Sequence, residues 1–336
     1  MKNVKKYGAV GDNVTDDTAA IQAAVDDLTS DGGDIYLPPG DYKITAPITI
    51  QKGTTIRGSG PLGTKISNYG DDDAIYAYTP AFGVAQLTIT DLRILNRITP
   101  KTDRTKGAGI HIDTDGGYYV NYMIQNVDIY SHYECIKVKN TVSAFIQNVK
   151  LVTPLTDGFL SVGTCNALSL NSVYAVHPGV HGFNINGTGL YYSTLNNCAC
   201  DLAGFISTGD AYHFTADTDA TLGATGLTLT GCGAEGASGR SFYSLNSMNA
   251  NLIGCFFLTS MGDAVHLRGG IDQSIIGVNA TRDGTAPGGT YDLNLPTSTK
   301  CECSNVGMIT SYFGTWPISG DPAEINDPES ALTILL

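Results

Sequence analysis

One short pattern returns along most of the chain, and it restricts the possible folds more than any other feature. Four residues ending in an apolar side chain recur at steps of roughly 23 residues, with occasional longer intervals. The pattern reads ITDL up to Leu92 and IQNV up to Val127, and its later copies end at Val149, Val173, Cys198, Cys232, Cys255, Val278 and Val306. A regular step with insertions predicts a solenoid, whose loops grow outward from a constant coil.

A second strand recurs once in each repeat. It reads GIHI at Gly109, CIKV at Cys135, GFLSV at Gly158, GFNI at Gly182, AYHF at Ala211, SFYSL at Ser241, AVHL at Ala264 and YDLNL at Tyr291. Inward apolar residues alternate with outward ones, as strands require. Because one such unit cannot bury its apolar side alone, stacking is obligatory. We therefore predict an all-β fold, a parallel β-helix of about nine or more coils.

The first sixty residues are predicted to cap this stack. KKYGAV is predicted as a short strand, and DTAAIQAAVDDL as an amphipathic helix with Ile21, Val25 and Leu28 on one face. Thr15 or Asp16 can cap its first turn. A helix over the open end of a stacked sheet hides edge groups that would otherwise pair with another chain. We divide one continuous domain into a cap with the first coils (1–60), a β-helix barrel (61–310) and a tail (311–336).

The repeat also predicts two internal columns. Cys198, Cys232 and Cys255 occupy the position of valine in other coils, so we expect them to act as apolar core residues. Asparagines that precede this position, Asn126, Asn148 and Asn197, are expected to stack at a turn. The cysteine spacings do not fit zinc ligation, and we expect neither a metal site nor a cofactor.

Charge narrows the range of partners. The formal net charge is −13, with 19 Lys and Arg against 32 Asp and Glu. Nucleic acids and anionic membrane surfaces reward basic proteins, so we expect neither as a partner. The charge also counts against a strongly anionic polysaccharide, although a local basic patch could override the total. No apolar run reaches the length of a membrane span.

The opening of the chain resembles the start of a known family. YGAVGDNVTDDTAAIQAAV followed by GGDIYLPPGDYKIT is similar to the pectate-lyase-like β-helix family of phage tailspikes and secreted polysaccharide-degrading enzymes. The resemblance implies a right-handed parallel β-helix with an N-terminal capping helix, a homotrimer, and an extracellular or virion-associated location. It leaves the reaction open, because the family includes lyases, hydrolases, isomerase-like enzymes and inactive binders.

Two carboxylates share an outward position on consecutive coils. Asp201 and Glu235 each lie three residues after the recurring apolar residue, so their strands should be about 4.8 Å apart. Glycoside hydrolysis needs one protonated and one ionised carboxyl group, and repulsion between the two can separate their roles. We predict Asp201, Glu235 and His177 as catalytic residues, with space for a sugar above Gly233.

Other outward residues are predicted to bind the sugar chain. Aromatic rings can stack on sugars. The predicted substrate-binding residues are Tyr130, Lys150, Tyr174, Tyr191 and Arg240. Asp157, Asp210 and Asp263, near the second strand, are alternative acids, and His213 and His266 should face outward.

These observations give three functional hypotheses. The first is a tailspike-like endo-glycosidase that depolymerises a bacterial surface or extracellular polysaccharide. The second is a polysaccharide lyase, in which a histidine or tyrosine abstracts a proton. The third is a non-catalytic glycan-binding spike.

Overall fold

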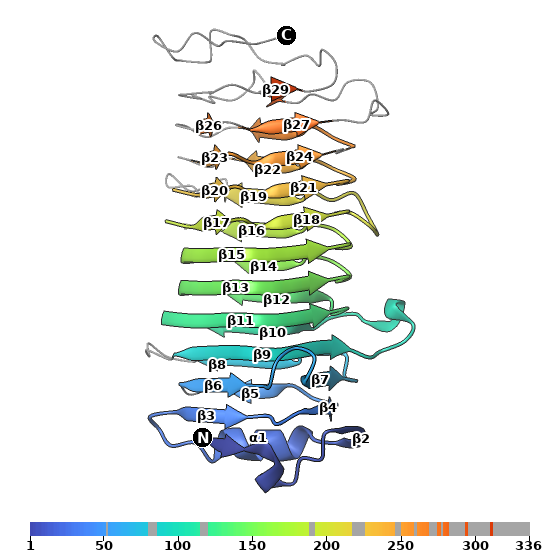
Figure 1. The fold of residues 1–336 in the computed structure, drawn as a ribbon, viewed down its shortest axis with the longest axis vertical. Coiled ribbons are helices and arrows are strands. Elements are labelled where there is room, and N and C mark those ends of the chain that lie inside the picture. Colours follow the sequence, from blue (N-terminus) through green and yellow to red (C-terminus); the bar gives the residue numbers. More distant parts are fainter. Residues whose placement is uncertain are drawn as a thin grey trace.

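A computed structural model describes residues 1–51, 53–79, 86–114, 120–187, 192–216, 226–245, 250–258, 261–268, 274–276, 278–281, 293–294 and 310–311. These residues form a parallel β-helix of about nine turns, whose coils are stacked along one axis (Figure 1). Among them, no helix is both long and apolar enough to cross a membrane.

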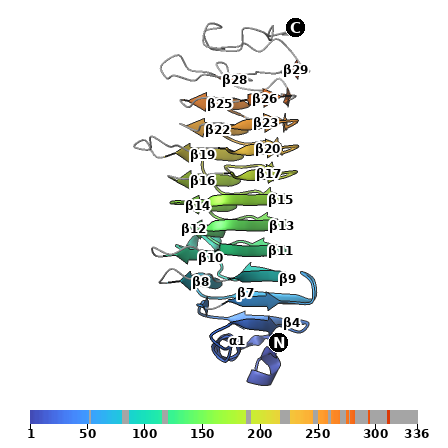
Figure 2. The same cartoon turned by 90° about the vertical axis from the view of Figure 1, so that its left-hand side faces the viewer.

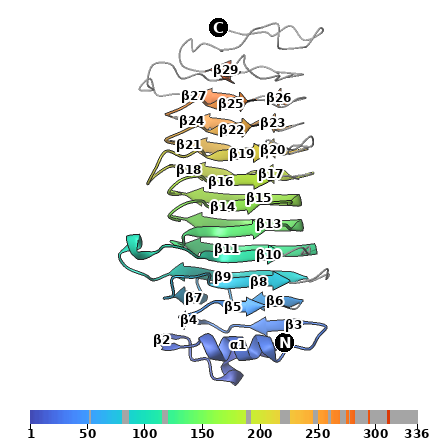
Figure 3. The ribbon, with the colours of Figure 1, turned by 180° about the vertical axis from the view of Figure 1, so that it is seen from behind.

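The strands fall into two parallel sheets that face each other across the core (Figure 2). The ten-stranded sheet contains β5 (Ile48–Ile50), β8 (Ile75–Thr79), β10 (Ala108–Thr114), β12 (Glu134–Lys139), β14 (Phe159–Val162), β16 (Phe183–Gly187), β19 (Tyr212–Ala216), β22 (Phe242–Leu245), β25 (Val265–Arg268) and β28 (Leu293–Asn294). It is seen from its own side in Figure 3.

The nineteen-stranded sheet begins with β1 (Lys2–Asn3), β2 (Asp12–Asp16), β3 (Gly33–Tyr36), β4 (Gly40–Ile44), β6 (Thr54–Arg57), β7 (Thr64–Asn68) and β9 (Leu87–Asn96). It continues with β11 (Val120–Tyr130), β13 (Val142–Val152), β15 (Asn166–Val176), β17 (Thr194–Asn196), β18 (Ala199–Asp201), β20 (Thr228–Thr230) and β21 (Gly233–Glu235). Its last strands are β23 (Asn251–Ile253), β24 (Phe256–Leu258), β26 (Ser274–Ile276), β27 (Asn279–Thr281) and β29 (Thr310–Ser311).

The predicted apolar column is confirmed. Val127 pairs with Leu92 on one side and Val149 on the other, and Val149 pairs with Val173. The residues that follow Val173 and Cys198 pair in the same register through the later coils. Every column residue from Leu92 to Val278 is at most 1% exposed, while Val306 lies outside the described residues. The three cysteines of the column are buried free thiols.

The asparagine column is confirmed for Asn126 and Asn148, whereas Asn197 Nδ2 donates to Ser172 Oγ of the preceding coil at 3.3 Å. Asn126, Asn148 and Asn197 have φ values of 53°, 51° and 51°, in the left-handed region that asparagine tolerates better than most residues. Asn148 Nδ2 donates to Asn126 Oδ1 at 3.3 Å, and Asn126 Nδ2 donates to Asp91 Oδ1 of the preceding coil at 2.6 Å. These side chains hold the corner at which each coil bends.

The cap differs from the prediction at KKYGAV and at GDNVTDD, which is expected as a polar turn but contains strand β2 (Asp12–Asp16). KKYGAV was expected as a strand, but a 3-10 helix, η1 (Val4–Tyr7), follows β1, since Asn3 accepts a hydrogen bond from the Lys5 backbone N–H and Gly8 ends the turn with φ 103°. The capping helix is present as α1 (Thr18–Asp26) at the N-terminal end of the stack (Figure 1). Asp16 Oδ1 accepts from the Thr18 backbone N–H at 3.0 Å. A second short 3-10 helix, η2, spans Lys101–Asp103.

Candidate functional site

The predicted acid pair lies on the outward side of the nineteen-stranded sheet. Asp201 and Glu235 are register partners in β18 and β21, as the repeat predicts. Asp201 is half-buried and Glu235 is exposed. The Tyr174 hydroxyl donates to Asp201 Oδ2, and this hydrogen bond, with burial and the charges of both acids, raises the pKa of Tyr174 to about 12. Tyr174 is therefore a hydrogen-bond donor at neutral pH.

His177 lies just beyond the end of β15, beside the same pair. Its backbone N–H donates to the Asp201 carbonyl at 2.9 Å, and its φ is 50°. The imidazole stacks on the ring of Phe205 with centroids 5.5 Å apart. Phe205 is 71% exposed, so this stacked pair forms an aromatic surface next to Asp201.

The predicted sugar-binding residues are only partly brought together. Lys150 is exposed on β13 and is the register partner of Tyr174. Tyr130, on β11, has the Arg93 guanidinium 5.0 Å from its ring centroid. Tyr191 lies outside the described residues. Arg240 was grouped with these residues, but its side chain belongs to a separate cluster at the ten-stranded sheet.

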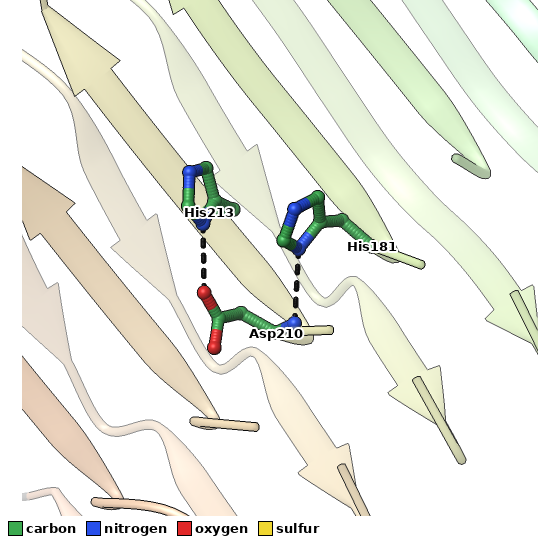
Figure 4. Close-up of side chains that lie close together, drawn as sticks. All are labelled: His181, Asp210 and His213. Carbon is green, nitrogen blue, oxygen red and sulfur yellow. Dashed lines mark hydrogen bonds and ion pairs between the residues drawn. The ribbon is translucent and has the colours of Figure 1, made fainter. Parts of the chain in front are cut away.

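This second cluster consists of His181, Asp210 and His213 (Figure 4). Asp210 lies in the turn before β19, His213 is an outward residue of β19, and His181 precedes β16 in the neighbouring coil. His213 Nδ1 is 2.7 Å from Asp210 Oδ2, and the Asp210 backbone N–H donates to His181 Nδ1 at 2.9 Å. The two imidazole rings stack with centroids 4.2 Å apart.

The hydrogen bonds select one tautomer for the neutral form of each ring. His213 donates from Nδ1 to the carboxylate, which leaves the lone pair of Nε2 available as a base. His181 accepts at Nδ1, so its proton is on Nε2. One ring can therefore take up a proton while its neighbour donates a hydrogen bond.

Burial and charge fix the ionisation of this cluster. Burial lowers the pKa of His181 to about 4, and the neighbouring His213 adds to this effect. Burial alone would raise the pKa of Asp210, but hydrogen bonds from His213 and Arg240 and the guanidinium charge lower it to about 2. At neutral pH, Asp210 is a buried anion and His181 is uncharged.

Arg240 completes the set and argues against a metal ion. Its Nε and a terminal nitrogen lie 2.9 and 3.0 Å from the two carboxylate oxygens of Asp210, and its guanidinium carbon lies 3.8 Å from the Tyr243 ring centroid. The spacing of the two histidines and Asp210 could suit a cation. However, a guanidinium already satisfies both carboxylate oxygens, so this arrangement fits acid–base chemistry better than metal ligation.

A buried acid lies in the adjacent coil. Asp157 accepts from the His181 backbone N–H at 3.1 Å and from Asn184 Nδ2 at 3.0 Å. Burial raises its pKa. It is 7% exposed, which makes it a candidate proton donor beside the histidines.

Sequence reasoning named Asp210 and His213 separately but missed their pairing. The signal was present: GDAYH and GDAVH, two coils apart, each place an aspartate three residues before an outward histidine. The second copy forms the same contact, since His266 Nδ1 is 2.7 Å from Asp263 Oδ2. The aspartate ends a turn and the histidine lies on the strand that follows, so both side chains reach the same outward surface.

Comparison with known proteins places the chain in a family. The sequence profile of the rhamnogalacturonase A/epimerase, pectate lyase-like family matches residues 1–209. The chain belongs to this family. The resemblance of the first coils to pectate-lyase-like β-helices is thereby confirmed.

Curated relatives of this pectate-lyase-like chain include two enzymes of Azotobacter vinelandii. Mannuronan C5-epimerase AlgE1 is 29% identical over 222 residues, which cover 59% of this chain and 15% of the relative. Alginate lyase 7 is 30% identical over 212 residues, which cover 54% of this chain and 23% of the relative. The chain thus spans less than a quarter of the length of either relative.

Solved structures share the fold of this family member at low sequence identity. DFA-IIIase from Arthrobacter chlorophenolicus A6 has a TM-score of 0.72 and 14% identity, covering 96% of this chain and 87% of that one. The gp42 tailspike of Acinetobacter phage vb_AbaP_AS12 has a TM-score of 0.59 and 14% identity, covering 98% and 66%.

Proposed function

We propose that this chain is an enzyme that acts on a uronate-containing polysaccharide by removing a proton from a sugar ring. The observation that carries the proposal is the Asp210–His213 pair, stacked beside the neutral His181; among the described residues, Nε2 of His213 has no hydrogen-bond partner. A general base must be unprotonated at working pH and held in place by a second group. The names of two relatives, a mannuronan C5-epimerase and an alginate lyase, support a uronate as the substrate.

The proposed step gives each residue one task. His213 Nε2 takes the ring proton next to the sugar carboxylate, and its electron pair moves toward that carboxylate. The Nε2–H of His181 and the guanidinium of Arg240 stabilise the negative charge that builds there. In a lyase, Asp157 then protonates the departing glycosidic oxygen as a carbon–carbon double bond forms. In an epimerase, a proton returns to the opposite face of the same carbon.

A second candidate is the endo-glycosidase predicted at Asp201 and Glu235. It is supported by their register pairing on adjacent strands, which lie about 4.8 Å apart and suit a retaining mechanism if the side chains remain parallel. Tyr174 and His177 would position the sugar, and Tyr130, Lys150 and Tyr191 would bind its neighbours. The first candidate is preferred because its hydrogen bonds already divide the roles of base and donor.

Products and variants together separate these candidates. The chain is incubated with polymannuronate, alginate and a panel of neutral bacterial polysaccharides. Absorbance from a new double bond identifies a lyase, deuterium uptake from D2O without chain cleavage identifies an epimerase, and reducing ends without absorbance identify a hydrolase.

The variant His213→Gln should lower turnover of the uronate polymer by about 10²- to 10⁴-fold, the usual contribution of a general base. Asp201→Asn and Glu235→Gln should leave that turnover unchanged. The opposite result would assign the reaction to the acid pair. Binding without any product would support a glycan-binding spike.

We also propose a homotrimer and an extracellular or virion-associated location, supported by the similarity of the fold to a phage tailspike. Light scattering of the purified chain tests the number of subunits.

A further inference from the structure

Another cluster of ionisable side chains lies on the ten-stranded sheet, in coils nearer the N-terminus than the coil of His213. Asp73, in the turn before β8, accepts from the Ala108 backbone N–H at 2.6 Å, and its other oxygen is 2.8 Å from His111 Nδ1. The Tyr76 ring lies 5.1 Å from the His111 ring. The Asp–His contact seen at Asp210 thus recurs here between neighbouring coils.

Glu134 lies next to this pair and has an unusual environment. It is the register partner of Ala108 and is only 8% exposed. Within the part of the chain that the structure describes, its carboxyl group makes no hydrogen bond. Burial raises its pKa, and the charges of Asp157 and Asp73 act in the same direction, whereas Lys137 and His111 oppose them. The raised pKa makes Glu134 easier to protonate than an exposed glutamate, and its protonated O–H can donate a hydrogen bond.

Lys137 supplies a positive charge to the same surface. It is the register partner of His111 on β12, is half-buried, and makes no ion pair with any described residue. Its neighbour Lys139 differs, because its Nζ is 3.2 Å from Asp113 Oδ2. An unpaired cation beside a carboxyl group that can donate a hydrogen bond is suited to an anionic ligand, since a carboxylate accepts from both.

We propose that Lys137, Glu134 and His111 form a subsite that binds the carboxylate of a uronate residue. This inference rests on the proposed function, because it assigns the subsite to the same polymer that reaches His213. Successive register partners lead from His213 through Asn184 and Leu160 to Lys137 and then His111. Lys137 therefore lies three coils, or about 14 Å, from the reacting base, and His111 lies four coils, or about 19 Å, from it. The polysaccharide would run across the strands, along the axis of the β-helix.

Binding can be measured without turnover. Isothermal titration uses the His213→Gln protein with mannuronate oligomers of two lengths, a disaccharide and a long oligomer. The long oligomer can reach both sites, whereas the disaccharide is too short. Lys137→Met in this background should weaken binding of the long oligomer by on the order of tenfold, the worth of one charged hydrogen bond. The disaccharide, bound near His213, should be unaffected.

Three controls complete the test. Lys65→Met removes a half-buried outward lysine of β7, in the other sheet, and should leave binding of the long oligomer unchanged. Lys137→Arg should restore most of the affinity because it restores the charge. A neutral polysaccharide should bind no differently to any variant.

The subsite is overturned if Lys137→Met binds the long oligomer as tightly as the parent, or if Lys65→Met weakens it equally. Either result would leave the proposed function standing where the parent enzyme still turns over the polymer. Absence of turnover in the parent, with a Lys137-dependent affinity, would instead reject the reaction and retain the subsite.

Discussion

Buried titratable side chains determine how this molecule responds to protons, and His132 is the extreme case. It is fully buried, and neither ring nitrogen has a hydrogen-bond partner among the described residues. Burial, assisted by the charge of Arg104, lowers the pKa of His132 from 6.5 to about 3. Since the unfolded chain takes up this proton near pH 6.5 and the folded chain does not, stability from this residue is complete above pH 6.5 and is lost as the pH falls toward 3.

His132→Phe should remove this dependence, because phenylalanine fills a similar volume and does not titrate. Between pH 6 and pH 4, the free energy of unfolding of the parent should fall by about 1.4 kcal/mol per pH unit more steeply than that of the variant. Denaturant titrations at several pH values measure both slopes, and His181 contributes equally to each. Parallel pH profiles would mean that the folded protein can protonate His132.

At the scale of single residues, the sequence predicted the strand register of a residue better than the hydrogen-bond partners of its side chain. The recurring four-residue pattern was sufficient to place Asp201 beside Glu235, because the strand register follows from the column of Val173, Cys198 and Cys232. It could not show that Asp210 binds His213 and Arg240, since that contact depends on how a turn aims its side chain onto a strand.

Coil corners are the elements that keep the two sheets in register, and they leave little room for additional side-chain atoms. Gly182 lies between His181 and β16, where an added Cβ would be 2.3 Å from Cys200 Sγ and 2.6 Å from the Ala211 carbonyl oxygen. The second contact is with backbone of the next coil, which cannot move without shifting β19. This explains why glycine or another small residue starts the second strand in every unit except the last, which begins with Tyr291.

Gly182→Ala should therefore destabilise the protein by about 1–3 kcal/mol, as expected for overpacking. Gly233→Ala is a matched control in the same fold, since the nearest atom to its added Cβ is the Phe256 carbonyl oxygen at 3.6 Å. Thermal unfolding of both variants measures the difference. Equal stabilities would show that the corner can relax.

The repeating elements were predictable from the sequence because each coil imposes the same spacing on its apolar residues. The segment KKYGAV was not, because local hydrogen bonds override its short alternating pattern: Asn3 Oδ1 accepts from the Lys5 backbone N–H, and the Gly8 backbone N–H donates to the Lys5 carbonyl. The register of a strand can be checked against many coils with the same spacing. The cap segment occurs once, so no second copy can confirm its predicted structure.

At the scale of the whole molecule, charge and proposed substrate oppose each other. The chain carries a formal net charge of −13, and a polyuronate is also anionic. Long-range repulsion should slow the approach of the polymer, while Lys137 and Arg240 act only at short range. Salt screens the first effect more than the second, because the Debye length falls from about 30 Å at 0.01 M to about 8 Å at 0.15 M and partly buried contacts are screened less.

We therefore expect the KM for polymannuronate to fall as ionic strength rises from about 10 to 150 mM, the reverse of what a basic enzyme would show. Exchange of Glu235 and other exposed acids for glutamine should flatten this dependence by reducing the repulsion. A neutral polysaccharide that is also bound should show a constant KM, which separates screening from any effect of salt on the fold. A KM for the polyuronate that rises with salt would contradict this expectation. Attraction by the outward lysines of the ten-stranded sheet would then outweigh the long-range repulsion from the net charge.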